Sequence, residues 1–181
     1  KKMAEAASMM ANVDYDMQLI SGIYEIIPNR FGAGIIQKNF EMLGEIEYTD
    51  YEINYANTIL KESGKELKGL DGKIKPIRPT IPAQGGSTDV GDVSQVVPVV
   101  RLSTTTAAKD GPWHSWAVVA CTGMSIGHKG MIYASKALAM TMLDLYQNPK
   151  FIDGVKKEYI ERIGDRVYVP QIPPGPPKLV D

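Results

Sequence analysis

The chain has 181 residues, and at roughly 100–200 residues per domain this length allows one domain or slightly more. Its composition, 44% hydrophobic and 23% charged, excludes a disordered, collagen-like or disulfide-scaffold chain. The 20 Lys and Arg residues balance 21 Asp and Glu residues, so the formal charge of -1 gives no electrostatic reason to expect nucleic acid or an anionic membrane as partner. The single cysteine, Cys121, cannot form an internal disulfide, and we expect a cytoplasmic protein.

The first 28 residues predict a helix followed by a strand. Residues 1–11 are rich in Ala, Met and Glu with no capping residue ahead of them, so we expect a chain that begins inside a helix and is the C-terminal part of a longer protein. Residues 15–27 alternate apolar and polar side chains at first, which is typical of a half-buried strand. Pro28 and Asn29 break this strand and indicate a domain boundary.

Two helices and a loop are expected next. Residues 31–43 carry apolar side chains at helical spacing, and Gly44 ends the helix. Thr49 and Glu52 have the spacing of a capping box that opens a second helix, which runs to about Ser63. The following residues, 65–84, are polar and contain three prolines, which predicts a connecting loop.

The segment 85–89 predicts a glycine-led turn into a short helix capped by Ser87, Thr88 or Asp89. Residues 96–102 are apolar and predict a buried strand, which Pro98 restricts to a sheet edge or a bulge. After a loop of small residues, we expect a further short strand at 117–120.

The last third predicts two more helices and a tail. Residues 130–146 are apolar nearly all round, which indicates a buried central helix. Residues 151–163 predict an amphipathic helix, and residues 170–177 have the composition of a polyproline-like tail.

Few residues are candidates for chemistry. His114 lies between two tryptophans in a loop that follows an apolar strand, where it is either a metal ligand or general base, or a loop histidine bonded to backbone. His128 is expected to cap or pack at its helix, and Cys121 to be a small buried hydrophobe. The 85–89 turn either presents backbone amides to a carboxylate or oxyanion, or is simply a turn. A hydrolytic metal site needs about three protein ligands per ion, so most of such a site would lie outside this chain.

Several motifs together resemble a known family. They are the run from Gly86 to Ser94 (GSTDVGDVS), the apolar stretch through Pro98, the sequence His114-Ser115-Trp116, and the helix entry Gly127-His128-Lys129-Gly130. This combination resembles the C-terminal part of the B-type proteins of aminobenzoyl-glutamate utilisation. These are amidohydrolases of the dinuclear metallopeptidase family that includes aminoacylases, glutamate carboxypeptidases and succinyl-diaminopimelate desuccinylases.

The resemblance implies an α/β fold: residues 29–181 would be the closing half of a mixed-sheet, zinc-peptidase-like catalytic domain. Residues 1–28 would be the last helix and strand of an α+β lid, or dimerisation, domain. His114 would match the family's last metal ligand, and Gly86, Ser87, Thr88 and Asp89 would match a segment beside the substrate. The complete protein would hold two divalent ions, zinc or manganese, and act as a homodimer or hetero-oligomer.

The implied reaction is metal-assisted hydrolysis of N-acyl or p-aminobenzoyl amino acids, such as p-aminobenzoyl-glutamate. The general base is expected in the N-terminal half, so the chain alone is expected to be inactive. An alternative hypothesis is a non-catalytic binding or assembly subunit that pairs with a chain carrying the remaining ligands. A serine hydrolase that uses Ser87 with Asp89 and His114 is a third, less favoured because no G-x-S-x-G motif occurs.

Overall fold

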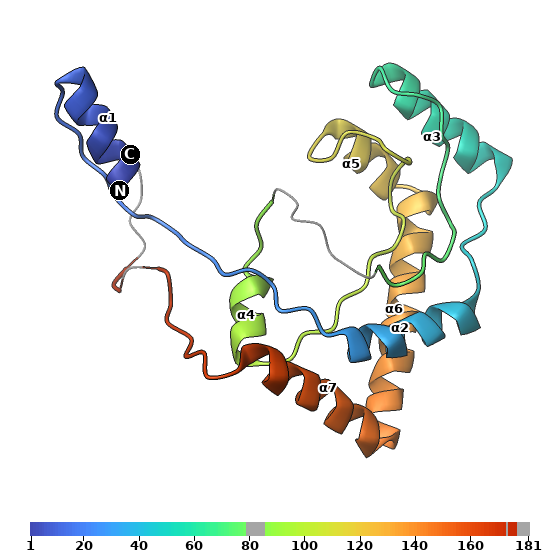
Figure 1. Ribbon diagram of the computed structural model, residues 1–181. Helices are drawn as coiled ribbons and strands as arrows, with labels where there is room; N and C mark the ends of the chain where they lie inside the picture. Colours follow the sequence, from blue (N-terminus) through green and yellow to red (C-terminus); the bar gives the residue numbers. More distant parts are fainter. Residues whose placement is uncertain (79–85, 173, 177–181) are drawn as a thin grey trace.

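The computed structural model describes residues 1–78, 86–172 and 174–176, and the regular structure in these residues is helical (Figure 1). The predicted mixed sheet is not formed among them, so the α/β architecture stays a prediction. None of the helices in this part of the chain has the length and hydropathy needed to cross a bilayer. The helices in chain order are α1 Lys2–Ala11, α2 Arg30–Leu43, α3 Asp50–Glu62, α4 Val90–Val96, α5 Trp116–Thr122, α6 Ser125–Gln147 and α7 Pro149–Ile163.

The predicted helix boundaries at α2 and α3 are confirmed. The Asn29 side chain accepts a hydrogen bond from the Gly32 amide (2.8 Å), and Gly44 ends α2 with a φ of 78°. At α3 the capping box is complete, because Thr49 Oγ1 accepts from the Glu52 amide (3.3 Å) and Glu52 Oε2 accepts from the Thr49 amide (2.7 Å). Local capping chemistry therefore sets both helix starts.

A small apolar core joins α3, α5 and the start of α6. Leu60, Cys121 and Ile126 are fully buried there, with Ala56 and Ala117 between them. The expected burial of Cys121 is confirmed, and burial raises the pKa of its thiol. Such a thiol is less ionised than a free one, which disfavours nucleophilic chemistry.

A buried carboxylate ties the start of α3 to the start of α6. Glu52 is 2% exposed, and its oxygens accept from Lys129 Nζ (2.7 Å) and from Ser125 Oγ (2.6 Å). Burial acts to raise the pKa of Glu52, but these bonds and those from Thr49 outweigh it and lower that pKa to about 2. Burial, together with the negative charge of this carboxylate, raises the pKa of Tyr48 to about 12.

The long helix α6 is confirmed, although it begins at Ser125 and is only partly buried. Asn39 of α2 holds it by donating to Thr141 Oγ1 (3.0 Å) and Asp144 Oδ2 (2.9 Å). His128 lies one turn inside α6 and is exposed, so the expected capping or packing role is wrong. Several of the exposed α6 side chains are large and apolar, namely Met131, Ile132, Leu138, Met142, Leu143 and Tyr146.

The short strand expected at residues 117–120 is wrong, because these residues belong to α5. Ser115 caps this helix: its Oγ accepts from the Ala117 amide (3.3 Å) and donates to the Pro112 carbonyl (2.6 Å). Gly123 follows its last turn. The serine cap thus overrides the strand preference of the two valines in the segment.

Helix α1 stands apart from the other helices and buries none of its residues (Figure 1). The extended residues 13–29 connect it to α2, and on the way they contact residues 169–171. The Tyr24 hydroxyl donates to the Val169 carbonyl (3.0 Å), and Gln171 Nε2 donates to that hydroxyl (2.8 Å). The predicted tail at 170–177 lies partly outside the described residues, as do positions 79–85 of the predicted loop and turn.

Candidate functional site

The glycine-led turn (residues 86–89) leads into α4 as predicted. Gly86 has a φ of 116°, in the region that favours glycine, and Asp89 is the cap residue of α4. The Asp89 carboxylate makes no capping bond, whereas Thr88 Oγ1 accepts weakly from the Val90 amide (3.4 Å). Ser87 and Asp89 are exposed, so their side chains are available to a ligand.

Helix α4 is anchored on the extended segment that precedes α2. Ser94 Oγ accepts from the Ile27 amide (2.9 Å), and Gln95 Nε2 donates to the Glu25 carbonyl (2.9 Å). Gly91 packs directly on the Tyr24 carbonyl, where a Cβ atom would collide with backbone. These contacts fix the position of the glycine-led turn relative to residues 24–27.

His114 lies on the loop that leads into α5. Its φ of 56° is left-handed, a conformation that costs a non-glycine residue on the order of 1 kcal/mol. The neighbouring Ser115 holds the backbone through its bonds to Pro112 and Ala117. The imidazole is exposed and forms no hydrogen bond within the described residues, so both of its nitrogens are open to solvent or to a ligand.

The structure does not bring the predicted site residues into contact. No hydrogen bond or ion pair between described residues joins His114 to the glycine-led turn, and no described pocket is lined by both. Likewise, nothing in the described part of the chain bonds Ser87 to a histidine, and the serine hydrolase hypothesis gains no support. The two predicted elements thus remain separate features on different loops.

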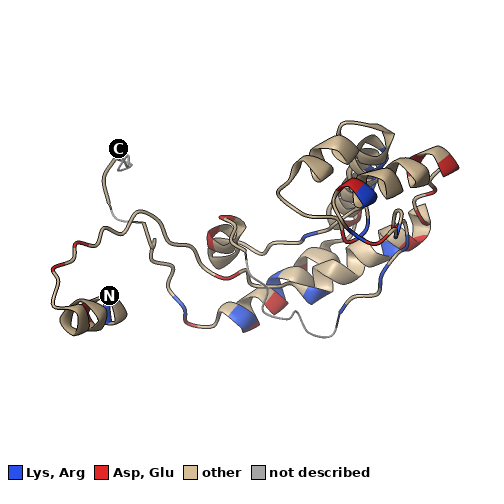
Figure 2. Ribbon diagram, turned by 90° about the horizontal axis from the view of Figure 1, so that it is seen from above, with Lys and Arg blue, Asp and Glu red and all other residues tan. Residues whose placement is uncertain are grey.

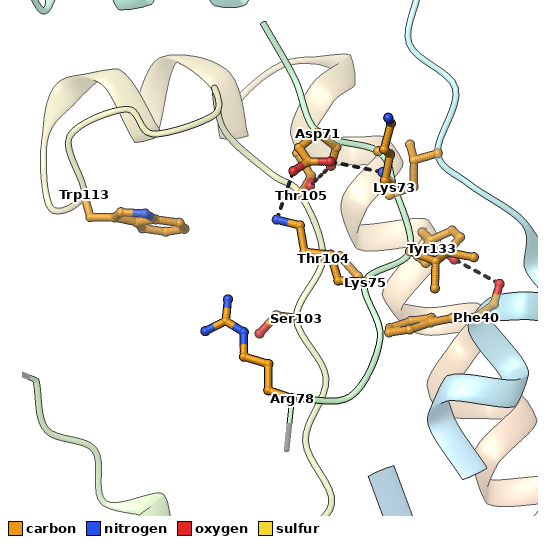
Figure 3. A pocket seen from close by; sticks show the side chains of 13 residues that line it. Phe40, Asp71, Lys73, Lys75, Arg78, Ser103, Thr104, Thr105, Trp113 and Tyr133 are labelled. Carbon is orange, nitrogen blue, oxygen red and sulfur yellow. Dashed lines mark hydrogen bonds and ion pairs between the residues drawn. The ribbon is translucent and has the colours of Figure 1, made fainter. Parts of the chain in front are cut away.

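A cleft of about 690 Å³ opens beside the His114 loop, and the sequence reasoning missed it (Figure 3). We call it the cationic cleft. One wall is the extended segment 71–78, with Lys75 and Arg78 directed into the opening, and the hydroxyl-rich segment 103–105 forms the floor. Trp113, next to His114, closes one end, and the stacked rings of Phe40 and Tyr133 (centroids 5.4 Å apart) close the other.

The charges in the cationic cleft do not cancel. Asp71 pairs with Lys75 (2.9 Å) and Lys109 (3.5 Å), and the bond from Lys75 lowers the pKa of this carboxyl against the opposing effect of burial. Lys73 and Arg78 have no carboxylate within ion-pair distance among the described residues. Basic and acidic residues are interspersed along much of the ribbon (Figure 2), whereas the segment 71–78 carries Lys73, Lys75 and Arg78 against Asp71. The close spacing of Lys73, Lys75 and Arg78 in a non-helical stretch was the sequence signal for this positive charge.

The residues present fit a metal ion in kind but not in number. An exposed imidazole such as that of His114 is a common ligand for zinc or manganese. In the parts of the chain that the structure describes, however, no three His, Cys, Asp or Glu residues gather into a metal-binding group. We therefore derive no reaction step through a metal ion from this chain.

The described residues thus offer an exposed loop histidine, a glycine-led turn and a cationic cleft. Among curated proteins, the chain is similar to the B component of the p-aminobenzoyl-glutamate hydrolase of Escherichia coli (strain K12), which is named as a subunit, with 25% identity over 197 aligned positions. The alignment covers 95% of this chain but 41% of the relative, so the chain spans about two fifths of the relative's length. The predicted resemblance is thereby confirmed. No family model and no solved structure matches the chain.

Proposed function

We propose that this chain is part of a metal-dependent amidohydrolase that cleaves the amide bond of N-acyl or p-aminobenzoyl amino acids, with p-aminobenzoyl-glutamate as the leading substrate. The observation that carries the proposal is the match to a p-aminobenzoyl-glutamate hydrolase subunit along 95% of this chain. The exposed His114 and the cationic cleft beside it add chemistry suited to that reaction. The single, buried Cys121 is in keeping with a cytoplasmic location.

In this proposal His114 is one ligand of a site for two zinc or manganese ions, and the other ligands and a glutamate base belong to the preceding part of the protein. Such ions, when bound, supply Lewis-acid chemistry: they polarise an amide carbonyl and make water more acidic. The residues of this chain orient the substrate instead. Ser87, Thr88 and Asp89 shape the pocket from the glycine-led turn, and the left-handed backbone at residue 114 presents the imidazole to solvent.

We also propose the division into a lid segment, residues 1–28, and the closing part of an α/β catalytic domain, residues 29–181. Helix α1 supports the first, because it buries no residue against the remaining helices. The extended stretch 98–106 supports the second. No hydrogen bond from backbone to backbone involves these nine residues within the described chain, although most of them are partly buried, as in a strand whose neighbours are missing.

A second candidate function is a non-catalytic binding or assembly subunit. The relative is named as a subunit, and the described residues of this chain offer His114 without further metal-binding partners. In that case a separate chain would carry the ligands and the base. In the favoured proposal the protein assembles as a homodimer or hetero-oligomer and contains the whole site.

The test is hydrolysis of p-aminobenzoyl-glutamate, followed as release of p-aminobenzoate, with zinc or manganese added. The protein to assay is this chain joined to the preceding part that we propose, beside the 181-residue chain alone. We expect turnover in the longer protein, at least about a hundredfold loss on His114→Ala, and no turnover in the chain alone. His128→Ala is the matched control, since His128 is equally exposed and is expected to keep full activity.

Each other outcome is informative. Unchanged turnover in His114→Ala would remove the metal-ligand role. Turnover by the 181-residue chain that depends on His114 would show that this chain holds a whole site. An inactive longer protein that gains activity only with a second subunit would favour the assembly function.

A further inference from the structure

The cationic cleft has two kinds of surface that the proposed roles of His114 and the glycine-led turn leave unused. One is positively charged and carries the guanidinium of Arg78 and the ammonium of Lys75, with the Ser103 and Thr104 hydroxyls opposite (Figure 3). The other is the flat indole of Trp113, which is 69% exposed at the end of the cleft. A volume of about 690 Å³ lies within the usual range for small-molecule sites, which is roughly 300–1,000 Å³.

The charged surface selects an anion. Lys73, Lys75 and Arg78 repel one another along a short stretch of chain, and Asp71 is already shared between Lys75 and Lys109. Arg78, with no carboxylate partner in the described residues, has a planar fork of donors that fits a carboxylate in bidentate geometry. The Ser103 hydroxyl adds a donor for the same group, whereas the Thr104 and Thr105 hydroxyls already donate to the Gly130 and Asp71 carbonyls.

The aromatic surface selects a ring on the same ligand. An exposed indole gains most from contact with another flat group. Trp113, the residue that precedes His114, presents its indole to the cleft. A ligand with an aromatic ring against Trp113 and an acidic end at Arg78 would therefore place the amide bond that links its two ends close to the His114 loop. A compact inorganic anion would use the charged surface alone.

We propose that the cationic cleft is the binding site for the free carboxylate end of an aromatic N-acyl amino acid, with Arg78 as carboxylate ligand and Trp113 as the stacking surface for the ring. The choice of substrate class rests on the proposed function, but the site itself is defined by the cleft. Binding here requires no metal ion and no bond cleavage. The two proposals can therefore fail separately.

The chain contains two tryptophans, so its indole N–H groups give two resolvable signals in a ¹⁵N-correlated NMR spectrum. Trp116→Phe assigns them, because it removes the signal that does not line the cleft. The 181-residue protein is titrated without metal with p-aminobenzoyl-glutamate, glutarate, benzamide and inorganic phosphate. We expect the first to shift the Trp113 signal with saturation and to bind more tightly than the other three.

The decisive comparison is Arg78→Gln against Arg101→Gln. Arg101 is an exposed arginine that does not line the cleft, so its loss removes the same charge elsewhere. We expect Arg78→Gln to weaken binding by about tenfold or more, and Arg101→Gln to leave it within about twofold. An unchanged Trp116 signal in both variants shows that the fold is kept.

Three results would overturn the proposal: equal affinity in Arg78→Gln and the parent protein, no saturable shift of Trp113, or phosphate or glutarate binding as tightly as p-aminobenzoyl-glutamate. The last would make the cleft a general anion site. A metal-dependent hydrolysis assay that fails while Trp113 and Arg78 still bind the ligand would count against the proposed function and leave the cleft assignment intact.

Discussion

Glu52 offers a direct test of how the helices are held together. Its carboxylate is 2% exposed, caps α3 through the Thr49 amide and pairs with Lys129 of α6 at 2.7 Å. Glu52→Gln keeps the shape of the side chain but removes its charge. We expect this change to destabilise the fold, because the Lys129 ammonium loses its counter-ion and one of its hydrogen-bond acceptors.

The size of the effect follows from the lowered pKa. Bonds from Lys129, Ser125 and Thr49 outweigh burial and lower the pKa of Glu52 from 4.5 to about 2. At 1.36 kcal/mol per pKa unit, this corresponds to about 3 kcal/mol of preference for the ionised form in the folded state. The Lys129 side chain is 36% exposed and can be hydrated in the variant, so we expect a loss of about 2 kcal/mol at pH 7.

The pH dependence has a definite sign. Because the folded-state pKa is depressed, the stabilisation is fully present above pH 4.5 and is lost as the pH falls toward 2, where the folded protein also takes up the proton. The difference between the parent protein and Glu52→Gln should therefore shrink over that interval. Other carboxyls titrate in both proteins and cancel in the difference.

The measurement is urea unfolding of both proteins at several pH values from 7 to 2. Glu62→Gln is the control, since Glu62 is an exposed residue at the other end of α3 and its loss should change the free energy of unfolding by less than about 0.5 kcal/mol. A Glu52→Gln effect as small as that of the control would refute the reasoning, and so would a difference that stays constant between pH 5 and pH 2.

Three further predictions concern the backbone and the α2–α6 contact. Gly91→Ala should lower the free energy of unfolding by about 2 kcal/mol or more, because its Cβ would meet the Tyr24 carbonyl. Gly34→Ala, with open space around it in α2, should raise that free energy by up to about 1 kcal/mol. Equal effects of the two variants in urea unfolding would contradict this. Asn39→Leu should cost about 1–3 kcal/mol because the side chain is 2% exposed and bonds both Thr141 and Asp144; a neutral effect would show that the pairing is dispensable. His114→Gly should be about 1 kcal/mol more stable than His114→Ala, because only glycine adopts the left-handed backbone there without cost, and equal melting temperatures would disprove the strain.

Local signals in the sequence predicted the helices well. The Thr49–Glu52 box and Gly44 act within a few residues of where they stand, so one sequence suffices to place them. The strand expected at 117–120 was wrong because the Ser115 cap begins a helix there despite the two β-branched valines in the segment. The predicted burial of Cys121 was confirmed, since small apolar residues surround it on three helices.

The candidate site was harder to predict because it depends on long-range contacts. His114 and the glycine-led turn were found as patterns, but the cationic cleft joins segments 71–78 and 103–105 with Trp113, Phe40 and Tyr133, which are far apart in sequence. Alternating lysines in a loop usually mean a hydrated surface, so their spacing alone did not distinguish a ligand site. Folding of the intervening chain is what places a hydroxyl floor beneath them.

The exposed surface area of the chain bears on the predicted sheet. The chain exposes 13130 Å², whereas a compact monomer of 19.9 kDa exposes about 8,700 Å². Part of the excess is apolar and lies on α6, the helix whose sequence predicts burial on all sides, at Met131, Met142 and Leu143. The stretch 98–106, which includes most of the strand predicted at 96–102, has no backbone-to-backbone hydrogen bond within the described residues. A sheet would bury both the apolar face of α6 and the stretch 98–106, whose backbone has no backbone partner among the described residues, and this is the support for the proposed α/β architecture.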